Sequence, residues 1–181
     1  YLTSLEVSGV QANRTKRKKT INDLINNSAD NLKLYPDLSD KLLNEITDLV
    51  ESPDLLVGNF DSKYLSLPTE VLCTVMKNHQ RYIPLFKINR KFSKLDLDSK
   101  KTLSTKFFLI SNGLREANKS ITKGNENVLK ARFADAKFFI ETDLNLSCNE
   151  RNKKISSISY LKGLGNIADK VERMIFIANE I

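Results

Sequence analysis

One short stretch of this sequence, residues 77–84, reads K-N-H-Q-R-Y-I-P and raises the question of acid–base chemistry. It holds the only histidine of the chain, His79, with two cations, two amides and a tyrosine. A histidine acts as a general base when a nucleophile lies within hydrogen-bond reach. Cys73 precedes it by six residues, so on a single helix the two side chains point to roughly opposite faces. This spacing argues against a nucleophilic pair.

Motifs for metals and phosphates are also missing from the sequence. One histidine and two isolated cysteines, Cys73 and Cys148, supply neither a CxxC pair nor a Cys/His ligand set. The segment Lys162-Gly-Leu-Gly165 lacks both the Lys-Ser/Thr of a P-loop and the dinucleotide-binding spacing. The sequence therefore predicts no complete catalytic site, no metal site and no cofactor bound by this chain.

Positive charge is the second feature with functional content. The net charge of +7 attracts polyanions such as nucleic acid. Cations crowd the start of an expected helix, where each opposes the helix dipole by roughly a few tenths of a kcal/mol, and a bound polyanion would offset that cost. The alternative is a solvated helix face. The candidate phosphate contacts, which include a second group in the loop after residue 86, are Arg14, Lys16, Arg17, Lys18, Lys19, Lys87, Arg90 and Lys91.

Apolar spacing predicts the elements that must position these residues. Helices are expected from the cap residue Asn13 to about Leu32, over 38–51, over 66–79, from the cap residue Asn125 onward, and over 167–181. Short apolar runs predict strands over 54–60, 81–88 and 105–111. The last two strands are expected to pair antiparallel across a long basic loop, with Pro84 at an edge or a bulge.

The histidine stretch then falls at the junction of a helix and a strand. His79 and Gln80 end the helix, and Arg81 and Tyr82 begin the strand. Two roles remain open for these residues, which are fixing the junction and contacting RNA. The missing nucleophile, metal ligands and phosphate loop argue against a catalytic role, and of the two remaining roles the sequence favours the first.

The expected fold class is α+β, with a small mixed or antiparallel sheet and packed helices. Residues 1–155 are assigned to this module, and residues 156–181 to a linker and the opening helix of a following all-α domain. A chain of 181 residues suits one ordinary domain with the start of another. The first residue is tyrosine rather than methionine, which favours an excised fragment. The short apolar runs and sparse cysteines predict a soluble, cytoplasmic protein.

Five motifs occur along the chain in a specific order. They are Leu67-Pro-Thr-Glu-Val-Leu72; His79-Gln-Arg-Tyr82 with Pro84; Phe107-Phe with Ser111-Asn112; Gly124-Asn-Glu-Asn-Val-Leu-Lys-Ala-Arg132 with Asp135-Ala136 and Phe138-Phe139; and Leu164-Gly165 with Asp169-Lys170 and Arg173. In this order and approximate spacing the sequence resembles the β subunit of bacterial-type glycyl-tRNA synthetase, most strongly from about Glu51 onward.

The resemblance implies an internal part of a longer subunit that works with a separate α subunit in an α2β2 ligase. In that family the α subunit uses glycine, ATP and Mg²⁺, whereas the β subunit helps to bind and position tRNA(Gly). The β subunit begins with a module similar to the editing-type domain of the phenylalanine enzyme, followed by an HD-like helical domain and an anticodon-binding domain. This chain would hold much of the first module and the opening helix of the HD-like domain.

The resemblance also suggests structural roles for motif residues rather than catalytic ones. Editing is not expected, because a site that excludes side chains leaves little misacylation to correct when the substrate is glycine. The leading hypothesis is a non-catalytic module that contacts tRNA and the α subunit. Its competitor is a purely structural docking module without RNA contact. The motif residues with expected structural roles are His79, Gln80, Arg81, Tyr82, Asn125, Glu126, Arg132 and Asp135.

Overall fold

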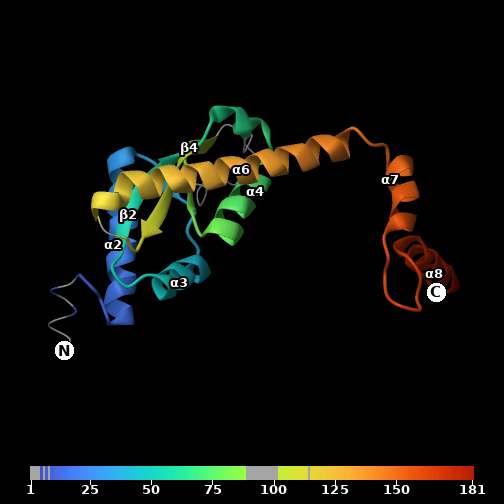
Figure 1. Ribbon diagram of the computed structural model, residues 1–181, viewed down its shortest axis with the longest axis horizontal. Coiled ribbons are helices and arrows are strands. Elements are labelled where there is room, and N and C mark those ends of the chain that lie inside the picture. Colours follow the sequence, from blue (N-terminus) through green and yellow to red (C-terminus); the bar gives the residue numbers. More distant parts are fainter. Residues whose placement is uncertain (1–4, 6, 8, 89–101, 114) are drawn as a thin grey trace. The chain divides into compact units, whose positions relative to one another are not determined.

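The computed structural model describes residues 5, 7, 9–88, 102–113 and 115–181 (Figure 1). Contacts divide the chain into two compact units, Tyr1–Lys137 and Phe138–Ile181. The division falls inside one continuous helix, α6 (Asn118–Leu144). The predicted domain boundary at residue 155 stays a prediction.

The first unit contains a four-stranded antiparallel sheet in the order β1-β3-β4-β2. The predicted strands are confirmed, and the strand pair expected across the basic loop is β3–β4. Pro84 coincides with an irregular register between Pro84 and Phe86, which confirms the predicted bulge, whereas the strand itself is internal. A short edge strand at residues 35–36 was not expected from the sequence. The strands are β1 (Tyr35–Pro36), β2 (Asp54–Asn59), β3 (Ile83–Phe86) and β4 (Leu103–Ser111).

Three predicted helices are confirmed, as α2 (Arg14–Leu32), α3 (Asp40–Leu49) and α4 (Thr69–Thr74). The predicted cap of α2 is correct, since the Asn13 side chain accepts a hydrogen bond from the Lys16 N–H at 2.9 Å. Helix α4 starts after Pro68 and continues into one π-helical turn, Val75–His79. A 3₁₀ turn, Ser62–Ser66, precedes it.

The expected cap at Asn125 is wrong. Helix α6 already begins at Asn118, directly after a 3₁₀ turn at Arg115–Ala117, and Gly124 lies inside it. The Asn125 side chain bonds back to the carbonyl of Ile121, four residues earlier, at 2.7 Å. Asparagine forms such local bonds in helix interiors as well as at caps, so residue type alone misplaced the helix start.

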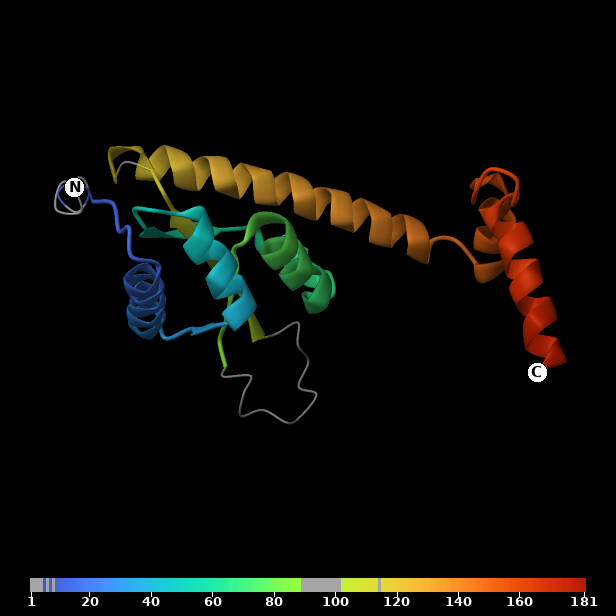
Figure 2. The same ribbon diagram turned by 90° about the horizontal axis from the view of Figure 1, so that it is seen from below.

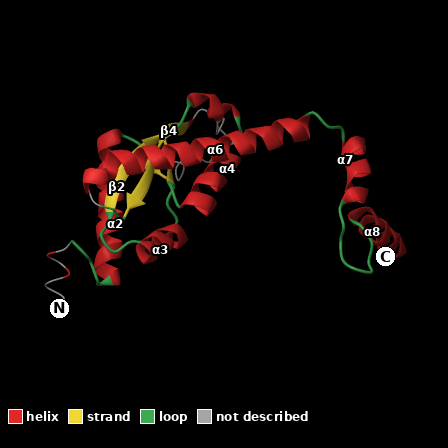
Figure 3. Ribbon diagram, viewed as in Figure 1, coloured by secondary structure: helices red, strands yellow, loops and turns green. Residues whose placement is uncertain are grey.

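The sheet carries packed side chains on both faces. Alternate residues of β4 point to opposite sides: Phe108 joins the cluster formed with α2 and α3, and Phe107 contacts Tyr82, which bonds to α6. Figures 2 and 3 show the sheet between these helices. Every residue of β3 is buried, as expected of a strand covered on both faces. The α+β fold class is therefore confirmed.

The second unit is helical. It continues α6 into α7 (Cys148–Lys154), a 3₁₀ turn (Ile155–Ser157) and α8 (Ile167–Glu180). Capping boxes at Ser147 and Asn166 begin α7 and α8. The structure describes every residue of this unit, and none of them is buried. The part of the chain that the structure describes contains no helix with the length and apolarity of a membrane span.

Candidate functional site

The helix–strand junction at residues 79–83 has an unusual backbone. Helix residues end at His79, Gln80 caps the turn, and Arg81 adopts a left-handed conformation with φ of 56°. Its N–H donates to the carbonyl of Lys77 at 3.2 Å, and the N–H of Tyr82 donates to that of Met76 at 2.9 Å. Glycine usually occupies such a position. The turn directs the chain so that Arg81 is exposed and Tyr82 is buried.

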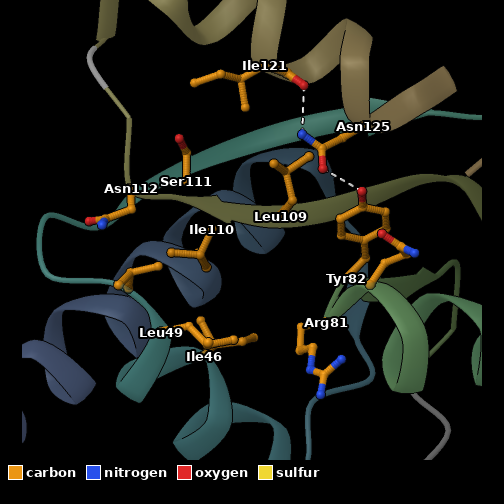
Figure 4. A pocket seen from close by; sticks show the side chains of 12 residues that line it. Ile46, Leu49, Arg81, Tyr82, Leu109, Ile110, Ser111, Asn112, Ile121 and Asn125 are labelled. Atoms are coloured by element: carbon orange, nitrogen blue, oxygen red, sulfur yellow. Dashed lines mark hydrogen bonds between the residues drawn. The ribbon is translucent and has the colours of Figure 1, made fainter. Parts of the chain in front are cut away.

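Tyr82 links the junction to two other elements. Its ring stacks on Phe107 of β4, with centroids 4.9 Å apart. Its hydroxyl donates to the side-chain oxygen of Asn125 on α6 (Figure 4). On β2, a Cβ at Gly58 would lie 2.3 Å from the Phe107 ring, so the strand fits only because this residue has no side chain. Gly58, Phe107, Tyr82 and Asn125 thus form one column on the face of the sheet that α6 covers, which we call the aromatic column.

The Tyr82 phenol should make stability depend on alkaline pH. Burial raises its pKa from the ordinary 10.0 to about 12. Because the folded pKa lies above the unfolded one, the full stability is present below pH 10 and is lost as pH rises from 10 towards 12, by up to about 2–3 kcal/mol. Urea unfolding at about pH 9 and pH 11.5 should show the original protein losing roughly 2 kcal/mol more than Tyr82→Phe. Parallel losses in both proteins would contradict this assignment.

A pocket of about 250 Å³ opens beside the aromatic column (Figure 4). Four parts of the chain form it, namely α3, the helix–strand junction, the end of β4 and the first turns of α6. Motif residues from distant parts of the sequence meet here. The lining residues are Ile46, Leu49, Val50, Gln80, Arg81, Tyr82, Leu109, Ile110, Ser111, Asn112, Ile121 and Asn125.

Hydrogen bonds fix the polar residues around this pocket. The Asn112 side-chain oxygen accepts the backbone N–H groups of Glu51 and Ser52, at 2.9 and 2.8 Å. The Arg81 guanidinium donates to the carbonyl of Asn78 at 3.2 Å and lies 3.5 Å from a Glu45 carboxylate oxygen. The pocket therefore combines an apolar bed with amide, hydroxyl and guanidinium groups at its rim.

The structure brings some of the other motif residues into contact and leaves others exposed. Glu126 accepts the backbone N–H of Asn59 at 2.9 Å and so connects α6 to β2. Arg132 and Asp135 lie on the exposed face of α6, and His79 is exposed outside the pocket. Cys73 is buried, so it does not share an exposed site with the histidine. Sequence reasoning missed Gly58, whose one signal was a glycine inside an apolar run.

Arg14 and Arg17, two of the candidate phosphate-binding cations, contact α3. Arg14 pairs with Asp48 through two bonds of 2.6 and 2.9 Å, and this hydrogen bonding raises the pKa of Arg14 and lowers that of Asp48. Arg17 donates to the carbonyl of Thr47 at 2.9 Å and to that of Gln11 at 2.5 Å. Both arginines therefore place positive charge at the C-terminal end of α3, where cations are favourable. These contacts with α3 explain why two arginines occur at the start of α2, where positive charge opposes the helix dipole.

The lysines among the candidates are arranged differently. Lys16 and Lys19 are exposed on the first turns of α2, and Lys18 is half-buried there. Lys87 is exposed directly after β3. Arg90 and Lys91 lie outside the described residues. Within the described part of the chain, no cluster of three or more His, Cys, Asp or Glu residues could hold a metal ion.

Comparison with known proteins places the chain in a family. The family model described as glycyl-tRNA synthetase beta subunit matches residues 1–181. Relatives named glycine–tRNA ligase beta subunit are 36% identical in Trichodesmium erythraeum, 38% in Halalkalibacterium halodurans and 35% in Bacillus subtilis, each over the whole chain. The chain spans only 24–25% of these relatives' lengths. The match over the whole chain shows that this chain belongs to the glycyl-tRNA synthetase beta-subunit family.

Proposed function

We propose that this chain is a non-catalytic module of a glycine–tRNA ligase, which helps to bind and position tRNA(Gly) and assembles with the catalytic α subunit. The observation that carries the proposal is the family match over the whole chain. In this proposal glycine, ATP and Mg²⁺ are used by the α subunit, and the enzyme works in the cytoplasm. The first unit corresponds to the editing-type module, the second opens the HD-like domain, and a second β subunit completes the α2β2 enzyme.

The lysines at the start of α2 support the RNA part of this proposal. The first turn of α2 contains no acidic residue, and the chain as a whole carries a charge of +7. Arg14 and Arg17 hydrogen-bond to α3, and the phosphate contacts are assigned to the lysines of the same helical turns, Lys16, Lys18 and Lys19. Lysine contacts with phosphates give affinity without sequence information, and they weaken as salt displaces them.

Replacement of these three lysines with alanine in the intact ligase should weaken tRNA binding. Each lost phosphate contact reduces the slope of log affinity against log salt by about 0.7–1, so the triple variant should lose about 2–3 in slope. Filter binding of tRNA(Gly) across a salt series measures this directly. Because the arginines are kept, the contacts between α2 and α3 should survive.

A charge-matched variant provides the control. Lys41, Lys119 and Lys130 are exposed on α3 and α6, and their replacement removes the same charge from other surfaces. Non-specific attraction predicts equal losses for both triple variants, whereas a site on α2 predicts a larger loss for the first. Unchanged affinity and salt slope after the α2 substitutions would show that this assignment is wrong.

The alternative function is an α-subunit docking module without RNA contact. It is favoured by the exposed apolar residues of α8, where Met174, Ile175, Phe176 and Ile177 are each 54–66% exposed. Large exposed apolar patches mark interaction sites. Co-purification of the α subunit with this chain in the absence of tRNA supports docking, and tRNA binding in the absence of the α subunit supports the leading proposal.

A further inference from the structure

Strand β4 continues past the end of its neighbour β3. The last pair between them is Ile83 with Phe108, whereas β4 runs on to Ser111. Residues 109–111 pair with β2 alone. In an antiparallel strand, successive residues present their N–H and C=O groups to alternate sides. At least one of these three residues therefore presents its backbone groups to the side that β3 has left.

The chain segment that replaces β3 at this point does not pair with the edge through its backbone. The N–H groups of Arg81 and Tyr82 donate to carbonyls of the preceding helical turn, at Lys77 and Met76. Among the described residues, no hydrogen bond connects residues 80–82 with residues 109–111. Figure 4 shows β4 crossing the pocket, with α3 side chains on one side of the strand and α6 side chains on the other. The result is a short open sheet edge, and such edges accept added strands.

The pocket at this edge suits an aliphatic side chain. The apolar bed of the pocket consists of Ile46 and Leu49 of α3 and of Val50, which follows this helix. Leu49 is 64% exposed at the surface. Its volume of about 250 Å³ is below the ~300–1,000 Å³ typical of sites for drug-sized molecules. Its single aromatic lining residue, Tyr82, is only 4% exposed. A nucleobase would thus find no open ring to stack on.

The polar rim offers mainly donors. Because the Asn112 oxygen already accepts two backbone N–H groups, its amide NH₂ is what remains for a ligand. The Ser111 hydroxyl oxygen accepts the N–H of Gly113 at 3.0 Å, which leaves its hydrogen to donate. Arg81 adds a guanidinium whose side chain is 44% exposed and which lies 3.5 Å from a Glu45 carboxylate oxygen, so a bound carboxylate would share this cation with Glu45. Amide, hydroxyl and guanidinium donors together are complementary to a carboxylate.

We propose that this edge pocket binds a short, extended, acidic segment of a partner protein. The segment adds as a strand beside residues 109–111, places an aliphatic side chain on the α3 bed, and directs a carboxylate to the donor-rich rim. This site is separate from the proposed tRNA contacts, because none of the lysines at the start of α2 lines the pocket. A negative result for the lysine variants would therefore leave this proposal unaffected, and a negative result here would leave the tRNA contacts unaffected.

Labelled pentapeptides test this site on the 181-residue chain. The panel has Val, Leu or Ile at the third position and Asp or Glu at the fourth, with matched peptides that carry Lys at the fourth. Fluorescence anisotropy should show saturable binding of acidic members and at least about tenfold weaker binding of the Lys-containing ones. N-methylation of the backbone amide at each position in turn should abolish binding at one or more positions, because a strand added to an edge needs its N–H groups. Failure of the whole acidic panel would overturn the proposal, and so would tolerance of every N-methylation.

The variant Asn112→Asp separates binding from folding. It keeps the oxygen that accepts the N–H groups of Glu51 and Ser52, but replaces the donor amide with a carboxylate. Acidic peptides should bind at least about tenfold more weakly, with an unchanged melting temperature. Arg81→Gln should weaken binding in the same direction, and Lys130→Gln, on an exposed part of α6 outside the pocket, should not. Displacement of the peptide by a single-stranded RNA hexanucleotide would identify an RNA site and overturn the proposal.

Discussion

Gly58→Ala should lower the free energy of unfolding of the first unit by about 3 kcal/mol. The added methyl group would lie 2.3 Å from Cζ and 2.7 Å from Cε1 of Phe107, which is fully buried and stacked on Tyr82. The ring cannot move away without disturbing the aromatic column, and overpacking of this kind typically costs about 1–3 kcal/mol or more. Urea unfolding of the original protein and the variant measures the difference.

Gly124→Ala is the matched control for this substitution. It adds the same methyl group to a helical position of α6 where nothing lies within 4 Å. Alanine is favoured over glycine in a helix, so stability should rise by about 0.5–1 kcal/mol. The double variant Gly58→Ala with Phe107→Leu should recover part of the loss by making room. If Gly58→Ala unfolds like the original protein, the column is not closely packed at β2.

Phe133→Ala should cost about 3–5 kcal/mol, because a fully buried phenylalanine leaves a large cavity when it is truncated. Phe133 lies on α6 with no exposed surface, 5.1 Å from the ring centroid of Phe60 and 5.4 Å from that of Tyr64. These contacts are the main apolar attachment of α6 to the segment after β2. The measurement is again urea unfolding, followed by circular dichroism and by tyrosine fluorescence.

The same helix contains a control of equal size. Phe138 and Phe139 are each 64% exposed, so replacing either with alanine removes little buried surface and should change stability by less than about 1 kcal/mol. A large effect at Phe138 or Phe139 and a small one at Phe133 would reverse the assignment of buried and exposed faces on α6. The two probes should also report one transition for the first unit if it unfolds cooperatively.

Local sequence signals predicted much of the fold. Asn13 was expected to begin a helix because its short side chain can accept a backbone N–H, and it does so from Lys16. The three long strands were predicted from short apolar runs with turn residues at their ends. These features depend on residues close together in the chain, so one sequence contains the information needed to find them.

The candidate site depended on contacts that no local pattern specifies. The hydrogen bond from Tyr82 to Asn125 spans 43 positions, and the pair of Arg14 with Asp48 spans 34. The left-handed backbone at Arg81 was also hidden, since glycine is the usual signal for that conformation. Tyr82 and Asn125 were nevertheless among the residues singled out from the motifs. The sequence did not indicate that these two residues are hydrogen-bond partners.

The contacts of Arg14 and Arg17 with α3 affect how selectively the basic start of α2 can bind different anions. Guanidinium groups recognise phosphates through two parallel bonds of fixed geometry, whereas a lysine ammonium acts as a mobile point charge. Both arginines are turned towards Asp48 and Thr47, and the other cations on the first turns of α2 are lysines. Such a surface can hold a polyanion near the enzyme but cannot tell one from another. If this surface binds tRNA as proposed, we expect selection among tRNAs to depend on residues other than these lysines.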